Sequence, residues 1–255
     1  MNTPVEHQPH LPDSSTESSP TVAGEKWAPA TLFGVIFQPQ AAFRAVGAKP
    51  RWVFPLAACL ILSLLSITLI VNRMGITNLM RAALQGNPQA EEIAQKAEES
   101  SFARTMIYVA PLIQLPIALA AVAGTYLLVF MLAGVETSFK QAFSVVTHAV
   151  FAYSLIATLL TMVTVYATKD FANFDLRNPI ATNVGFFLDP SEISKFLHSL
   201  ASSLDVLSFW FLYLLALGFA ETSPKTRVQK TFPVVVGVWV IYVIGKAAFS
   251  SIFGR

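Results

Sequence analysis

Residues 52–71, WVFPLAACLILSLLSITLIV, decide the fold because they form twenty consecutive positions without a charged side chain. A helix needs about 20 mostly apolar residues to cross the hydrocarbon layer of a membrane. Only helices and closed β-barrels satisfy every backbone polar group in lipid, and the sequence shows no alternating strand pattern. This stretch therefore predicts a transmembrane helix.

Four further apolar runs of similar length follow, at residues 108–133, 142–167, 204–220 and 232–249. The composition agrees, since 54% of the 255 residues are hydrophobic and only 13% are charged. A soluble domain has about 25% charged residues. The mean hydropathy is +0.57. We expect an all-α integral membrane protein, a bundle of five transmembrane helices with interfacial amphipathic helices.

The N-terminal segment differs in character from the rest of the chain. Residues 1–26 are rich in Ser, Thr, Pro, His and Glu and contain no apolar core. This composition predicts a disordered polar tail rather than a secretory signal. Residues 27–255 are expected to form one five-helix membrane domain.

The orientation follows from the distribution of basic residues. Five crossings put the two chain ends on opposite sides, and the two sides carry equal numbers of Lys and Arg. Short loops obey the positive-inside rule better than long ones. The basic residues crowd one short loop and the approach to the first crossing: Lys225, Arg227, Lys230, Arg44, Lys49 and Arg51. We predict a cytoplasmic N-terminus and an extracytoplasmic C-terminus.

An amphipathic segment precedes the first crossing. In residues 31–38 the helical period places Leu32, Phe33, Ile36 and Phe37 on one face, and Pro39 suits the first position of a second helix. Such a segment either lies along the inner headgroup region or packs against the bundle.

Residues 178–190, NPIATNVGFFLDP, form part of an outer linker in which turn residues alternate with a bulky apolar triplet. We expect these side chains to dip into the membrane interface or to plug between helices, as a structural cover; the alternative is a lid over a ligand or partner. The candidate cover residues are Asn178, Pro179, Asn183, Gly185, Phe186 and Phe187.

The end of this linker predicts the start of an amphipathic helix that continues into the fourth crossing. Asp189 is expected to cap it, with Pro190 at the first helical position and Glu192 completing a capping box. The earlier outer loop, residues 72–105, is polar and helix-prone. A solvated helical hairpin is expected there; an acidic partner- or cation-binding surface is the alternative.

Four polar residues within or beside the apolar runs are candidate functional groups, because ionisable residues at membrane depth are costly. Asp205 and Lys246 lie about 30 Å from the inner turn between the last two crossings, at about 1.5 Å per residue. We predict that they approach each other near the outer interface; alternatively, Lys246 snorkels and Asp205 faces solvent. His148 and Gln114 are candidate buried polar groups, either in structural hydrogen bonds or on a solute path.

Several classes of function are excluded. Cys59 is the only cysteine, and the four histidines show no metal-ligand spacing, so neither a metal site nor another cofactor is expected. A net charge of +2 without a basic arm excludes nucleic acid. No catalytic residues are predicted, because the sequence lacks nucleophile-elbow, phosphate-loop and HExxH motifs.

The order of several motifs resembles the Yip family, the Ypt/Rab-interacting polytopic membrane proteins, in its bacterial-type branch. The motifs are FQPQAAF at 37–43, KPRWVFP at 49–55, SFKQAF at 138–143, NPIATN at 178–183 and SLASSLD at 199–205. The resemblance implies five membrane helices, a cytoplasmic N-terminus and, in eukaryotic members, association with Rab-type GTPases. The chain lacks the Asp-Leu-Tyr-Gly-Pro-Phe-Trp segment of those members, which leaves GTPase binding in doubt.

These observations favour a non-enzymatic membrane protein, a scaffold or membrane-organising factor. Its partners are expected to be the lipid bilayer and other membrane proteins or further copies of itself. The expected location is a bacterial inner membrane. The alternative is a small-solute or ion transporter or channel.

Overall fold

The computed structural model describes residues 28–84, 87–171, 174, 176, 178–189, 192–223 and 226–253. The predicted tail at 1–26 lies outside the described residues, as do Pro190 and Lys225. The described elements are nine α-helices and one 3₁₀-helix. They are α1 Ala28–Phe37, α2 Pro39–Ala48, α3 Val53–Ala83, α4 Ala90–Glu99, α5 Ser101–Leu132, α6 Phe139–Ala167, η1 Val184–Phe187, α7 Lys195–Ser203, α8 Val206–Thr222 and α9 Val228–Phe253.

Four of the described helices, α3, α5, α6 and α9, are long and apolar enough to cross a membrane. The fourth predicted run forms α8, which is strongly apolar but has 17 residues. It is short because Leu204 leaves the helical conformation and Asp205 caps the new helix. The predicted helical membrane bundle is therefore confirmed, and four of its described helices have the length and apolar composition of a membrane span.

The first predicted crossing is longer than expected. α3 continues past residue 71 to Ala83, with Gly75 in a positive-φ conformation (φ 78°) that bends the helix. Beyond it, α4 packs back on α3 and begins at Ala90, so this outer loop contains a helical hairpin as predicted. The last part of α3, residues 72–83, therefore extends beyond the apolar stretch at 52–71.

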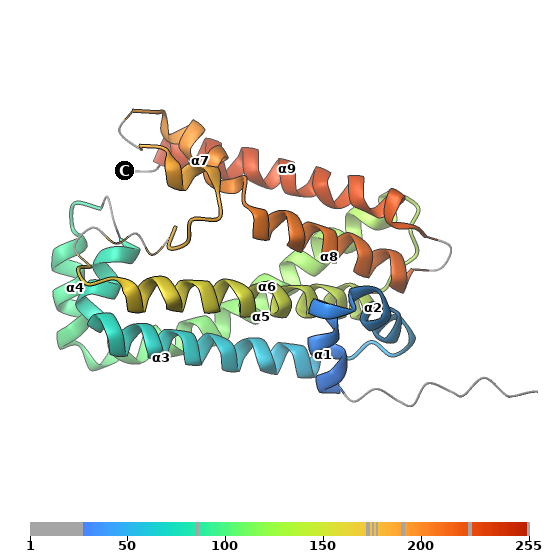
Figure 1. The fold of residues 1–255 in the computed structure, drawn as a ribbon, viewed down its shortest axis with the longest axis horizontal. Helices are drawn as coiled ribbons and strands as arrows, with labels where there is room; N and C mark the ends of the chain where they lie inside the picture. The colour runs from blue at the N-terminus through green and yellow to red at the C-terminus, as the bar shows by residue number, and fades with distance from the viewer. Residues whose placement is uncertain are drawn as a thin grey trace, which may run out of the picture.

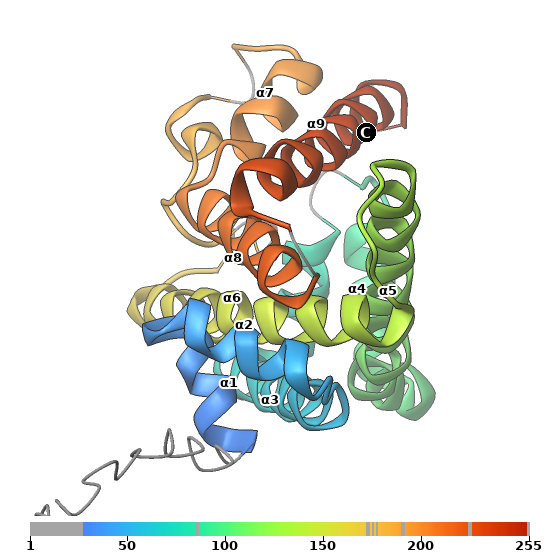
Figure 2. The same cartoon turned by 90° about the vertical axis from the view of Figure 1, so that its right-hand side faces the viewer.

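The helices lie roughly along one direction, and the two ends of the bundle are built differently (Figure 1). α1 and α2 cover one end, and α4 and α7 lie at the other, where α9 also ends. The described chain thus begins and finishes at opposite ends. Viewed from the α1–α2 end, α8 lies between α6 and α9, and α5 flanks the bundle on one side (Figure 2).

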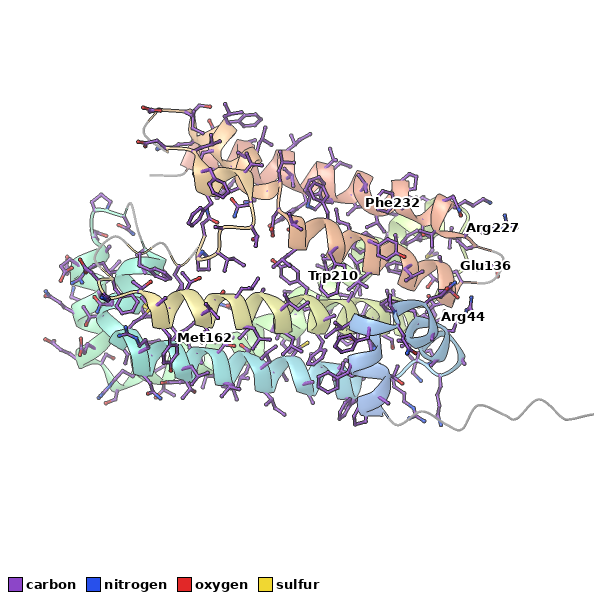
Figure 3. The ribbon with its side chains drawn as sticks, in the orientation of Figure 1. Arg44, Glu136, Met162, Trp210, Arg227 and Phe232 are labelled. Atoms are coloured by element: carbon purple, nitrogen blue, oxygen red, sulfur yellow. The ribbon has the colours of Figure 1, made fainter. Side chains whose placement is uncertain are left out.

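One fully buried part of the core lies where α2, α6 and α8 meet. Phe43 of α2, Val145 of α6 and Phe219 of α8 have no exposed surface. Phe130 of α5 packs against Phe219 with ring centroids 4.4 Å apart. Charged side chains surround this end of the bundle, where Figure 3 shows Arg44, Glu136 and Arg227. The apolar core is therefore closed off from one end by packed aromatic and branched side chains.

The N-terminal amphipathic segment packs against the bundle. Pro39 stands at the start of α2, as predicted, and Leu32 is buried. Phe43 and Val46 bury the inner face of α2 against α8 and α6. Phe37, however, is 80% exposed, so the segment also presents apolar surface outward.

Candidate functional site

The outer linker is tied to the break between α7 and α8 by two backbone hydrogen bonds. The amide of Val184 donates to the carbonyl of Leu204 (3.2 Å), and the amide of Val206 donates to that of Thr182 (3.1 Å). These bonds make a short antiparallel bridge between Asn183 and Asp205. The linker and the helix break, which are separated along the chain by α7, therefore form one structural unit.

Asn183 organises the linker through its side-chain amide. Its oxygen accepts from the amide of Phe186 (2.9 Å), which caps η1, and its nitrogen donates to Asn178 Oδ1 (2.6 Å). Gly185 lies so close to α7 that a Cβ built on it would be 2.1 Å from Ser202 Oγ. The linker therefore packs directly on α7, and only glycine fits at this position.

The two phenylalanines of the linker, Phe186 and Phe187, do not lie between helices, which was one of the two placements expected for them. Phe186 and Phe187 contact each other with centroids 5.5 Å apart, and Phe187 is 74% exposed. They do not plug between helices, because the close approach of Gly185 to α7 leaves these rings on the outer surface. Their insertion into the membrane interface stays a prediction.

The predicted helix start at Asp189 is wrong. α7 begins at Lys195, and its cap is Ser194, whose hydroxyl accepts from the amide of Leu197 (3.2 Å). Asp189 instead accepts a turn hydrogen bond from the amide of Glu192 (3.1 Å). A serine in extended conformation can cap a helix as well as aspartate, so composition alone did not distinguish the two positions.

Asp205 and Lys246 line the same cavity, each with an uncharged partner. Asp205 is 8% exposed; its carboxylate accepts from the amide of Leu207 and from Ser208 Oγ, each at 3.2 Å. Lys246 Nζ donates to Ser203 Oγ at 3.2 Å. Both are described residues, and the structure contains no ion pair between them within 4.0 Å. The two charges thus share a site without direct contact.

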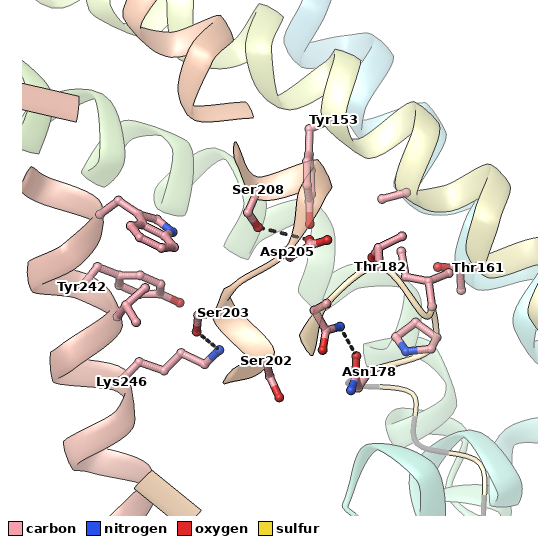
Figure 4. A pocket seen from close by; sticks show the side chains of 16 residues that line it. Tyr153, Thr161, Asn178, Thr182, Ser202, Ser203, Asp205, Ser208, Tyr242 and Lys246 are labelled. Carbon is pink, nitrogen blue, oxygen red and sulfur yellow. Dashed lines mark hydrogen bonds between the residues drawn. The ribbon is translucent and has the colours of Figure 1, made fainter. Parts of the chain in front are cut away.

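The cavity has a volume of about 440 Å³ and lies between α6, α7, α8, α9 and the linker (Figure 4). Three polar side chains in its wall are more than nine-tenths buried: Asn183, Ser203 and Asp205. Thr182 Oγ1 is also buried and lacks a hydrogen-bond partner. The contributions of Thr182, Ser203 and Trp239 were not anticipated from the sequence, because they depend on how the linker, α7 and α9 pack together.

The structure separates the other two candidates. His148 is buried on α6, where Nδ1 lies 2.7 Å from the carbonyl oxygen of Ser144 one turn earlier. Gln114 is exposed on α5, so the prediction that it is a buried polar group is wrong. Neither residue lines the cavity that contains Asp205 and Lys246.

Within the described residues, no group of three or more His, Cys, Asp or Glu side chains could hold a metal ion. Hydroxyls, amides, one carboxylate and one ammonium instead make up the polar chemistry of the cavity. Such groups can bind a small polar or zwitterionic group by hydrogen bonding and charge.

Fold and site together define a helical integral membrane protein with a polar cavity at one end of its bundle. A family model, the Yip1 domain, matches residues 33–249. The chain belongs to the Yip1 domain family, as its motif order predicted. Searches of the curated proteins and of the solved structures returned no significant match.

Proposed function

We propose that this Yip1-domain protein is a non-enzymatic membrane-organising or scaffolding factor that associates laterally with itself or with other membrane proteins. In this proposal it crosses a bacterial inner membrane five times, with its N-terminus in the cytoplasm and its C-terminus outside. α8 supplies the remaining crossing, the fourth along the chain, since its 17 residues reach the lower limit of about 17 for a spanning helix.

The observation that carries the proposal is the apolar seal between α2, α6 and α8. Conduction requires a polar or wettable passage through the whole bundle. Phe43, Val145 and Phe219 are fully buried at the α1–α2 end, while the polar cavity reaches only Tyr153 on α6 and Trp239 on α9. A closed end of this kind favours a scaffold over a channel.

The outer face of α5 supplies a surface for lateral contact. Ile113, Ile117 and Leu128 are exposed large apolar residues. Gly124 faces outward with no neighbouring side chain, since a Cβ built there has no atom within 4 Å. Together with Ala120 it forms a small-xxx-small pattern, which lets another membrane helix approach closely. Two further surfaces are available for contact with other proteins: the exposed ring of Phe37 at the α1–α2 end of the bundle, and linker residues 178–189 at the opposite end.

Crosslinking in native membranes, combined with a solute-flux assay in liposomes, tests this proposal. We expect specific co-purification without flux, and loss of the crosslinked species in Gly124→Leu because the larger side chain blocks close approach. Gly237→Leu is the matched control, since that glycine is also open and lies on α9. Flux that disappears in Asp205→Asn or Lys246→Met would overturn the scaffold proposal in favour of a transporter, the second candidate.

A further inference from the structure

We infer that the polar cavity and an adjoining apolar groove form one binding site for a phospholipid with an amine-bearing, zwitterionic headgroup. The headgroup amine lies against Asp205, the phosphate lies against Lys246, and an acyl chain occupies the groove. This inference goes beyond the scaffold function and does not depend on it.

The apolar groove is the first element of the site. It has a volume of about 330 Å³ and lies between α5, α8 and α9. Its wall includes Val122, Phe211 and Leu212. Trp239 and Tyr242 line both the groove and the polar cavity, so the two spaces adjoin at these aromatic residues. A polar space adjoining an apolar one matches the chemistry of an amphiphile.

The second element is the pair of separated charges. The Asp205 carboxylate is buried, and a buried charge is costly unless a partner neutralises it; Lys246 also lines the cavity but is an exposed residue. The carboxylate of Asp205 contacts an amide and a hydroxyl, and Lys246 contacts one hydroxyl, while neither reaches the other. An occupant with an ammonium at one end and a phosphate at the other neutralises both charges at once.

The remaining lining groups suit the same occupant. Lys246 has three N–H donors and uses one on Ser203, which leaves two for phosphate oxygens. Thr182 Oγ1, buried without a partner, is a further hydroxyl donor in the wall. At the other charge, the hydroxyl end of Tyr153 points toward Asp205 (Figure 4). A phenolic oxygen beside a carboxylate adds a second hydrogen-bond acceptor for a protonated amine.

Simpler occupants leave part of the site unused. A soluble zwitterion would not contact the groove. A lipid with an anionic headgroup but no amine would place negative charge near Asp205 without neutralising it. An amine-bearing phospholipid satisfies the carboxylate, the ammonium and the groove together.

Native mass spectrometry of the full chain in detergent tests the headgroup. The probes are phosphatidylethanolamine and phosphatidylglycerol with the same acyl chains, added in equal amounts. We expect the wild type to prefer phosphatidylethanolamine on the order of tenfold, the scale of one charged hydrogen bond. Asp205→Asn retains a good helix cap and should abolish the preference without abolishing binding. Lys246→Met should weaken binding of both lipids, whereas Lys230→Met, an exposed lysine on the same helix, should change neither.

The acyl chain is tested separately. Val122→Trp fills the groove and should weaken lipid binding about tenfold. The control is Met131→Trp, an exposed position on the same helix outside the groove. Glycerophosphoethanolamine, the soluble headgroup, should compete only weakly. Equal binding of the two lipids by the wild type, a preference that survives in Asp205→Asn, or competition by the soluble headgroup as strong as by the lipid would overturn the inference.

Discussion

Gly218 of α8 lies directly against Phe43 of α2. A Cβ built on Gly218 would be 3.0 Å from Phe43 Cε1 and 2.5 Å from Cγ1 of Val145 on α6. The three helices can therefore meet only because this position lacks a side chain. The absent side chain lets the N-terminal amphipathic segment become part of the bundle.

Replacing Gly218 by alanine should separate these helices. We expect Gly218→Ala to lower the free energy of unfolding by about 1–3 kcal/mol, the usual cost of overpacking a close-packed core. Gly245→Ala on α9 is the matched control, because its Cβ meets nothing within 4 Å. Thermal unfolding in detergent, followed by circular dichroism, measures both variants. Equal melting temperatures for the two would contradict the close contact.

Gly185→Ala should release the linker from α7, since the new methyl would overlap the backbone nitrogen of Ser202 at 2.7 Å as well as its hydroxyl. The hydrogen bonds donated by the amides of Val184 and Val206 should then open. Hydrogen exchange of these two amides should be faster than in the wild type and in Phe187→Ala, an exposed position on the same turn. Unchanged exchange in Gly185→Ala would show that the linker is not held there.

Glu221 links α2 to the end of α8 through two contacts. Its carboxylate accepts from Arg44 Nε at 2.8 Å and from Gln40 Nε2 at 2.7 Å. Arg44 is largely exposed and Glu221 is 16% exposed, so the pair should contribute about 0.5–1 kcal/mol. A double-mutant cycle with Arg44→Met and Glu221→Gln measures this coupling in the unfolding free energy. The coupling should fall at high salt; a value of zero at low salt would exclude the ion pair.

α4 should show a pH-dependent attachment to α3. Hydrogen bonds from the Arg81 guanidinium at 2.8 and 2.9 Å hold the pKa of Glu91 below its usual 4.5. The folded state thus favours the carboxylate, so the stabilisation is present above pH 4.5 and disappears as the pH falls through the lowered pKa. Carboxyl-carbon NMR should show Glu91 titrating at lower pH than in Arg81→Met. The same titration midpoint in both proteins would refute the contact.

Hydropathy predicted the long helices correctly, because a helix that crosses lipid needs apolar side chains at about 20 consecutive positions. Positions of the caps were harder to predict. Asp189 and Ser194 are both of a type that caps helices well, and the structure uses Ser194.

The site was only partly predictable for a similar reason. Counting helical rise brought Asp205 and Lys246 to the same level, and they do line one cavity. Counting gives depth and not direction, so it could not show that each would turn to a hydroxyl of Ser208 or Ser203. Gln114 was misplaced because a position within an apolar run does not reveal which face of α5 points outward.

The number and direction of the crossings are tested most directly by single cysteines. Native Cys59 is buried and is replaced by alanine to give a cysteine-free background. Cysteines are then introduced at the exposed positions Gln95, Lys140, Phe187 and Gln229. Each is labelled with a membrane-impermeant maleimide in intact cells and again after permeabilisation.

The account predicts that the cysteines at positions 95 and 187 react in intact cells, and that those at 140 and 229 react only after permeabilisation. This pattern requires α8 to cross the membrane between the third and the last crossing. If positions 187 and 229 reacted under the same condition, α8 would not cross, and the five-helix topology would be contradicted.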